Sequence, residues 1–182
     1  MNNEEKMKQS LIISIIVLLS AGFYLQSCHN NDPAKQRQKE LALLNDYIAR
    51  YDKVHGVNLQ PSLSGLYYVE EKEGYGDTIA VGDRVQVWYN TYLLSDTLLV
   101  DTNMPDGHKY EPLEFVVAPP GTSSVVEGLN EAVKNMKAGG KAFLIIPSQI
   151  GYGQNGTYGV PAFSTLLMDV EIYKVFRASE GY

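Results

Sequence analysis

The residue types that usually carry covalent or metal chemistry are few and scattered in this 182-residue chain. There is one cysteine, Cys28, so an internal disulfide framework is excluded. The three histidines, His29, His55 and His108, do not have the spacing of metal ligands, which argues against a Cys/His zinc site. No G-x-S-x-G motif or Cys/His pair indicates a covalent nucleophile. We therefore expect a function that needs no metal and no cofactor.

One segment has the pattern of a nucleotide-binding loop without its context. Residues 151–156 spell G-x-G-x-x-G after a predicted strand. A dinucleotide site also needs a helix that opens at the third glycine, because the N-terminus of that helix holds the pyrophosphate. The following residues, Thr157 to Pro161, cannot form that helix. We interpret residues 149–164 as a Gly-rich loop, and the chain has no GK[ST] sequence that would indicate a P-loop.

The N-terminal residues have the pattern of an export signal. Two lysines precede a 15-residue apolar run, Leu11–Leu25. A membrane-spanning helix needs about 20 residues, so a run of this length is typical of a signal peptide. The ending Leu-Gln-Ser-Cys resembles a bacterial lipobox, which predicts a lipoprotein signal peptide over residues 1–27 and a lipid anchor on Cys28. The alternative is a free cysteine after an uncleaved anchor. Both predict a membrane-attached protein of the bacterial cell envelope, on the periplasmic or surface side.

Charge and composition narrow the class of protein further. The chain has 15 Lys and Arg against 21 Asp and Glu, a formal net charge of -6. A protein that tracks phosphates needs a basic face, so nucleic acid is not expected as a partner. Apolar residues make up 45% of the sequence, which is enough for a packed core. The length suits one domain with appendages.

A polar tether over residues 28–33 precedes a predicted helix over residues 34–56. Four apolar residues recur at helical spacing and form one stripe, while Glu40 and the neighbouring charged residues fall mostly off it. These four are Leu41, Leu44, Ile48 and Tyr51. We favour the interpretation that this stripe packs on the chain's own domain. The alternative is a homodimer through the helix, for which the run is short. Residues 57–63 form a linker.

Apolar periodicity changes to two in the domain predicted over residues 64–178. The clearest strand is 84–94, where Val85, Val87, Tyr89 and Thr91 share one face. Further strands are expected at 66–70, 97–101, 114–118, 142–146 and 166–176, and one short helix at 129–136. One helix among strands in this order predicts an α+β fold, with an antiparallel sheet wrapped on the short helix.

Several short motifs occur in one order at domain spacing. They are Val87-Trp-Tyr89, Asp101-Thr102, Val125-Val-Glu-Gly-Leu129, Gly139-Gly-Lys141, Ile146-Pro147, Tyr152-Gly153, Val160-Pro161, Ser164-Thr-Leu166 and Asp169-Val-Glu171. The ordered set resembles the FKBP-type peptidyl-prolyl cis-trans isomerase family over about residues 64–176. Residues 64–68, which follow the predicted helix, resemble the exported, helix-prefixed branch. The resemblance implies a half-barrel sheet, an apolar pocket between sheet and helix, and proline-containing polypeptide clients.

The resemblance also implies roles for single residues. Tyr89, Asp101 and Tyr152 match the polar residues of the family's pocket, with Tyr152 as a donor to the prolyl carbonyl and Asp101 orienting Tyr89. The matching substrate-binding positions are Val100, Leu113, Phe115, Val125, Val126, Leu129, Val160 and Met168. Rotation about an X–Pro bond is opposed by ~18–20 kcal/mol because the amide is conjugated. A dry apolar pocket tolerates the less polar twisted amide better than the planar one, so it lowers this barrier without a nucleophile.

Four of these positions lack the aromatic ring that the family usually has there. They are Val100, Leu113, Leu129 and Met168. Two functions therefore stand: a lipid-anchored prolyl isomerase that assists protein folding outside the cytoplasm, and a weakly active or inactive module that binds extended or proline-containing segments. A third is a structural subunit of an envelope assembly that docks through its helix.

Overall fold

The structure is a computed structural model that describes residues 32–104 and 107–180. The signal peptide predicted at 1–27, and Cys28 with it, lie outside these residues. So does the predicted tether at 28–33, apart from its last two residues. The described residues fall into two compact units, divided between Gln36 and Arg37. Within residues 32–104 and 107–180, no helix is long and apolar enough to cross a membrane.

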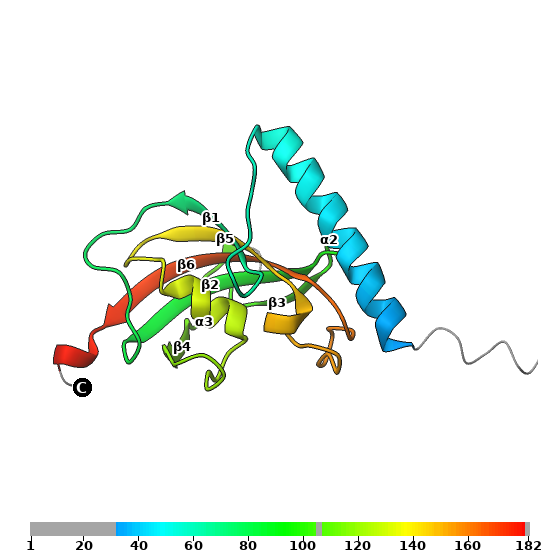
Figure 1. The fold of residues 1–182 in the computed structure, drawn as a ribbon. Coiled ribbons are helices and arrows are strands. Elements are labelled where there is room, and N and C mark those ends of the chain that lie inside the picture. Colours follow the sequence, from blue (N-terminus) through cyan, green and yellow to red (C-terminus); the bar gives the residue numbers. More distant parts are fainter. Residues whose placement is uncertain (1–31, 105–106, 181–182) are drawn as a thin grey trace, which may run out of the picture. The chain divides into compact units, whose positions relative to one another are not determined.

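Six antiparallel strands form one sheet in the described part of the chain (Figure 1). They are β1 (Tyr67–Lys72), β2 (Arg84–Leu93), β3 (Leu99–Thr102), β4 (Leu113–Val116), β5 (Lys141–Ile146) and β6 (Leu166–Phe176). The order along the sheet is β1-β5-β6-β2-β3, and β4 also pairs with β2. The longest pairing joins β2 to β6, from Arg84 opposite Phe176 to Leu93 opposite Leu166. Because β2 and β6 are central, their alternating side chains set what each face of the sheet carries.

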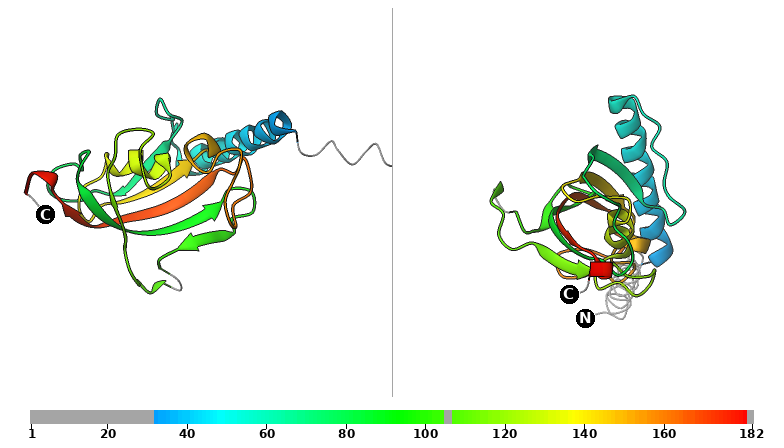
Figure 2. Two further views of the ribbon diagram at one scale, coloured as in Figure 1. Left: turned by 90° about the horizontal axis from the view of Figure 1, so that it is seen from below. Right: turned by 90° about the vertical axis from the view of Figure 1, so that its left-hand side faces the viewer.

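One short helix, α3 (Glu127–Val133), lies against one face of the sheet, and the strands curve around it (Figure 2). Two 3-10 helices, η2 (Ser148–Ile150) and η3 (Ala178–Glu180), follow β5 and β6. The predicted α+β fold is confirmed, with a sheet wrapped on a short helix and an N-terminal helix before it. Helix α3 begins two residues earlier and ends three residues earlier than the predicted 129–136. Its first turn was missed because Gly128 has no side chain and so does not show in the apolar period. A Cβ there would lie 2.5 Å from Cγ2 of Ile146, so the glycine permits the close packing of α3 on β5.

The main core fills the space between α3 and the inner face of the sheet. Val85 and Val87 of β2 have no exposed surface, and Leu129 and Val133 of α3 are 2% and 0% exposed. On β6 the inward residues are those that the alternation predicts: Leu166, Met168, Val170 and Ile172. Burial of these apolar faces is the main stabilising contribution to this sheet-on-helix arrangement.

Helix α2 (Pro33–His55) matches the helix predicted at 34–56 within one residue at each end. In the first unit, Asp32 caps it: the backbone N–H of Ala34 donates to the Asp32 carboxylate at 2.9 Å, and Pro33 takes the first helical position. In the second unit, Leu44 is 4% exposed and packs with Ile145 and Leu167, which point away from the main core.

The predicted stripe on α2 is wrong at one position. Leu41 is 40% exposed, and Tyr47 takes a place beside Ile48 in the cluster around Leu44. Glu40, expected off the stripe, is only 3% exposed. Its burial needs hydrogen-bond partners. Arg37 of the same helix provides one, and the other three come from Ser148 and Thr165, which no helical periodicity reveals.

Candidate active site

A cavity of about 430 Å³ opens between the inner face of the sheet and the start of α3. Strands β2, β3, β4 and β6, helix α3, the turn before α3 and the loop after η2 all contribute to it. The lining residues are Tyr89, Thr91, Asp101, Leu113, Ser124, Val125, Val126, Leu129, Gly151, Tyr152, Leu166 and Met168. Its wall is largely apolar. The polar side chains are those of Tyr89, Thr91 and Asp101 on β2 and β3, Ser124 before α3 and Tyr152 on the loop.

The pairing of three strands places the sheet's contribution. Thr91 stands opposite Asp101 of β3 on one side and opposite Met168 of β6 on the other. Directly opposite residues of antiparallel strands share a face, so these three side chains form one row across the inner surface. Tyr89 is two residues before Thr91 on β2 and therefore shares that face. Strand register thus brings a carboxylate and a phenol to one end of an apolar surface.

The phenol of Tyr89 and the carboxylate of Asp101 form the polar pair of the cavity. The Tyr89 hydroxyl donates to Oδ2 of Asp101 at 2.8 Å. Burial raises the pKa of Tyr89, and the hydrogen bond and negative charge of Asp101 raise it further. Burial also raises the pKa of Tyr152, with a second contribution from the charge of Asp101. Both phenols therefore stay protonated at neutral pH and can donate hydrogen bonds.

Tyr152 is presented by the loop that follows η2. The carbonyl of Ser148 accepts from the N–H groups of Gly151 at 3.0 Å and Gly153 at 2.8 Å. The carbonyl of Gly153 accepts from the N–H of Phe163 at 2.9 Å. Gly153 has a φ of 65°, in the left-handed region that favours glycine. These bonds hold the backbone on both sides of Tyr152 while its side chain remains 38% exposed at the cavity.

The turn that carries Val125 and Val126 is held by two side chains of α3. Asn130 has no exposed surface and forms a two-way pair with the backbone of Ala118: its amide donates to the carbonyl at 3.0 Å and its oxygen accepts from the N–H at 3.0 Å. The Glu127 carboxylate accepts from the N–H of Gly121 at 3.1 Å. Together they join the segment after β4 to the helix, which sets where the two valines meet the cavity.

Eight of the eleven predicted site residues line this one cavity. They are Tyr89, Asp101, Leu113, Val125, Val126, Leu129, Tyr152 and Met168. The other three lie elsewhere. Phe115 pairs with Val85 and is 5% exposed within the main core, Val160 is also 5% exposed in that core, and Val100 packs half-buried against it. These three side chains lie in or against the main core, and their role in substrate binding stays a prediction.

Four lining residues were missed by the sequence reasoning. Thr91 and Leu166 lie on inward strand positions, so the alternation that places Tyr89 and Met168 could have found them. Ser124 and Gly151 are sequence neighbours of Val125 and Tyr152, and only the path of the loops brings them to the cavity. In the described part of the G-x-G-x-x-G region, Gly156 is followed by turns and not by an α-helix, as the sequence indicated.

At three of the four positions where the family usually has an aromatic ring, an aliphatic or Met side chain faces the cavity. These residues are Leu113, Leu129 and Met168. Among residues 32–104 and 107–180, no cluster of three or more His, Cys, Asp or Glu side chains could hold a metal ion. The site can therefore enclose an apolar group while Tyr152 donates to an acceptor at its edge.

Comparison with known proteins links this geometry to one family. The family model described as FKBP-type peptidyl-prolyl cis-trans isomerase matches residues 76–173. The FK506-binding protein of Neisseria meningitidis serogroup B is 34% identical over 116 residues, 63% of this chain and 100% of that protein. The isomerase FkpA of Escherichia coli K12 is 35% identical over 136 residues, 75% of this chain and 46% of that protein.

Solved structures agree with the sequence matches. The crystal structure of Escherichia coli FkpA superposes with a TM-score of 0.66 at 29% identity and covers 98% of this chain and 75% of that one. AtFKBP13 gives a TM-score of 0.55 at 26% identity, covering 64% of this chain and 97% of that one. The chain spans about half the length of the curated relatives from Haemophilus influenzae and Escherichia coli, 51% and 46% respectively.

Proposed function

Because this chain belongs to the FKBP-type peptidyl-prolyl cis-trans isomerase family, we propose that it catalyses rotation about X–Pro bonds in polypeptide clients. One observation carries the proposal: a largely aliphatic cavity of about 430 Å³ holds the hydrogen-bonded Tyr89–Asp101 pair and Tyr152 at the same site. A prolyl ring is apolar and its preceding carbonyl is an acceptor, so the two chemical parts of the cavity match the two parts of the substrate.

The cavity acts on the barrier through its polarity. A planar amide has a large dipole that water stabilises, and twisting the C–N bond removes the conjugation that produces it. Four apolar side chains exclude water from the prolyl ring and so favour the twisted amide relative to the planar one. They are those of Val125, Val126, Leu129 and Met168. The Tyr152 hydroxyl, which is protonated at neutral pH, donates to the prolyl carbonyl. Asp101 holds Tyr89 as a fixed part of the wall.

A proline-limited refolding assay on the purified protein tests the proposal. We expect the protein to accelerate the slow refolding phase, which otherwise lasts tens to hundreds of seconds. Asp101→Ala should lower kcat/KM about tenfold or more, and Tyr152→Phe a few-fold, because each removes a polar group from the cavity. Tyr158→Phe is the matched control, since Tyr158 is on the same loop and fully exposed.

The same assay decides between the enzyme and the second candidate, a binding module. That candidate is favoured by the aliphatic side chains of Leu113, Leu129 and Met168, where aromatic rings would form a tighter slot. A folded protein that binds proline peptides without accelerating refolding, tested with several residues before proline, would contradict the isomerase and support the binding module.

We further propose that the protein acts on clients outside the cytoplasm, held in the cell envelope by acyl chains on Cys28. The support is the Leu-Gln-Ser-Cys ending of the apolar segment, which lies outside the described residues. Metabolic labelling with a fatty acid tests it. Because Cys28 is the only cysteine in the sequence, we expect Cys28→Ser to lose the label. An unlabelled wild-type protein, or label retained in Cys28→Ser, would contradict the anchor.

A further inference from the structure

A buried carboxylate of α2 makes four hydrogen bonds outside the cavity described above. Glu40 is 3% exposed. Its Oε1 accepts from the backbone N–H of Ser148 at 2.7 Å and from Oγ1 of Thr165 at 2.9 Å. Its Oε2 accepts from Oγ of Ser148 at 2.7 Å and from the Arg37 guanidinium at 2.6 Å. Both oxygens are thus engaged by two donors each, a complete set for a buried carboxylate.

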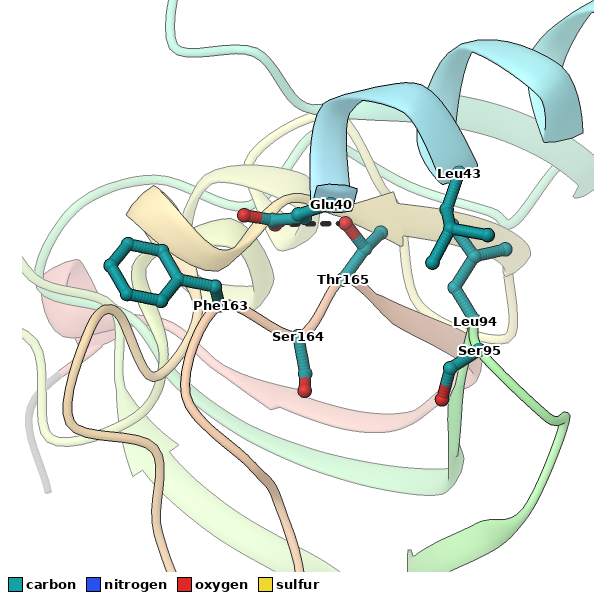
Figure 3. A pocket seen from close by; sticks show the side chains of 7 residues that line it. All are labelled: Glu40, Leu43, Leu94, Ser95, Phe163, Ser164 and Thr165. Carbon is teal, nitrogen blue, oxygen red and sulfur yellow. Dashed lines mark hydrogen bonds between the residues drawn. The ribbon is translucent and has the colours of Figure 1, made fainter. Parts of the chain in front are cut away.

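The two main partners of Glu40 are the two ends of the loop that carries Tyr152. Ser148 begins this loop and Thr165 ends it, just before β6. Figure 3 shows the hydrogen bond between Thr165 and Glu40, with Ser164 and Phe163 preceding Thr165 in the chain. Leu43 and Leu94 line the same cavity as these residues, and its volume is about 40 Å³. The base of the loop is thus held in two ways: β5 and β6 pair directly beside it, with Ile146 opposite Leu166, and the Glu40 carboxylate adds side-chain contacts to both of its ends.

Backbone hydrogen bonds within the loop connect both of its ends to the residues that flank Tyr152. From the first end, the carbonyl of Ser148 accepts from the N–H groups of Gly151 and Gly153, which flank Tyr152. From the second end, Phe163 donates its N–H to the carbonyl of Gly153. Phe163 has a φ of 54°, a left-handed conformation that costs energy for a residue other than glycine and persists only where its surroundings hold it.

We propose that Glu40 is a positioning residue of the active site: it ties both ends of the 148–165 loop and so fixes Tyr152 at the cavity. The kinetic part of this inference rests on the proposed isomerase function, whereas the ordering of the loop does not. Helix α2 then contributes to catalysis through Tyr152 although none of its residues lines the cavity. Four donors outweigh the burial of Glu40 and hold the pKa of its carboxyl below the ordinary value, so it is charged at neutral pH.

Hydrogen exchange of single amides in the purified protein tests the ordering of the loop. In Glu40→Gln, an amide NH₂ replaces one oxygen and faces one group that can only donate, the Ser148 N–H or the Arg37 guanidinium, while the hydroxyl partner can turn to accept. The contact at the base of the loop is therefore weakened. We expect the N–H groups of Gly151, Gly153 and Phe163 to exchange about tenfold faster or more, while the amides of β2 and β6 keep their rates. Asp46→Asn is the matched control, because it makes the same change on the same helix at a carboxylate that is 66% exposed.

Unchanged exchange of the three loop amides in folded Glu40→Gln would overturn the proposal. Thr165→Val provides a second test, since it removes one donor at the far end of the loop and leaves the Glu40 charge in place. If Glu40→Gln unfolds as a whole, Thr165→Val decides the question by the same amides, with faster exchange supporting the proposal and unchanged exchange overturning it.

The kinetic arm separates positioning from general stability. We expect Glu40→Gln to lower kcat/KM about threefold or more, and to lower it less when Tyr152 is already Phe. Equal losses in the two backgrounds would overturn the link to Tyr152. If the wild-type protein accelerates no refolding, the proposed isomerase function fails, while the exchange of Gly151, Gly153 and Phe163 still decides whether Glu40 orders the loop.

Discussion

Tyr89 and Asp101 are twelve residues apart in the sequence and share a hydrogen bond of 2.8 Å in the cavity. The bond exists because Asp101 stands opposite Thr91, two residues further along the same face of β2. Burial raises the pKa of Tyr152, and the negative charge of Asp101 raises it further. The three polar side chains therefore form one electrostatic unit, although they come from two strands and a loop.

At this scale a double-mutant cycle gives a prediction. Tyr89→Phe and Asp101→Ala should each lower kcat/KM by about tenfold, because each removes one partner of the same hydrogen bond to a charged group. The double variant should lose little more than either single one, since the bond can be lost only once. Steady-state kinetics of the three variants measures this. Tyr173→Phe, at a tyrosine 54% exposed, is the matched control. Losses that multiply fully would show that the pair does not act as a unit.

Helix α2 shows how one element serves two purposes. Its apolar face packs on Ile145 and Leu167 through Leu44, while Glu40 of the same helix reaches the ends of the Tyr152 loop. The helix could be predicted from periodicity, since Leu44, Ile48 and Tyr51 recur at helical spacing. The burial of Glu40 could not be predicted, because three of its four hydrogen bonds come from Ser148 and Thr165, which are 108 and 125 residues away in sequence.

A pair of identical substitutions on α2 tests the packing of the element. Leu44→Ala should lower the free energy of unfolding by about 2–3 kcal/mol, since it leaves a cavity beside Ile145. Leu41→Ala should cost less than about 1 kcal/mol, because Leu41 is 40% exposed. Urea denaturation with a common m-value measures both. Similar losses for the two variants would contradict the orientation of the helix, and would mean that Leu41 is covered in solution.

The molecule as a whole depends on carboxylates that the fold holds charged. Burial disfavours the charged forms of Glu40 and Asp83, but hydrogen bonds outweigh it and keep the pKa of each below its ordinary value. The Asp83 carboxylate accepts from the backbone N–H groups of Ala80 and Ala178, each at 3.0 Å, and from the Arg177 guanidinium at 2.7 Å. The pKa of Asp169 shifts in the opposite direction: burial raises it, so the charged form of Asp169 destabilises the fold.

These shifts set the direction of acid denaturation. A carboxyl whose folded pKa is lowered stabilises the fold fully above its unfolded pKa, and this stability is lost as the pH falls through the folded pKa. We expect the free energy of unfolding to fall below about pH 4.5, as the pH falls through the lowered pKa values of Glu40 and Asp83, while protonation of Asp169 offsets part of the loss. Urea denaturation at a series of pH values measures this.

Glu40→Gln should make the acid decline shallower, because the variant has no carboxyl at that position to protonate, and Asp46→Asn should follow the wild type. A wild-type stability that does not change on acidification, or an unchanged slope in Glu40→Gln, would contradict the assigned role of the buried carboxylate.

The sequence by itself determined the elements of this protein and their class. Period-two alternation in β2 and β6 and the apolar residues of α3 depend on near neighbours, so the antiparallel sheet on one short helix could be predicted. The ordered motifs also placed eight of the eleven predicted site residues in one cavity. The tertiary structure alone decided that Phe115 and Val160 are buried in the main core, that Val100 packs half-buried against it, and that Glu40 is buried. The physical reason is range: alternation follows from the local backbone, whereas burial and hydrogen-bond partners depend on segments that meet only when the chain folds.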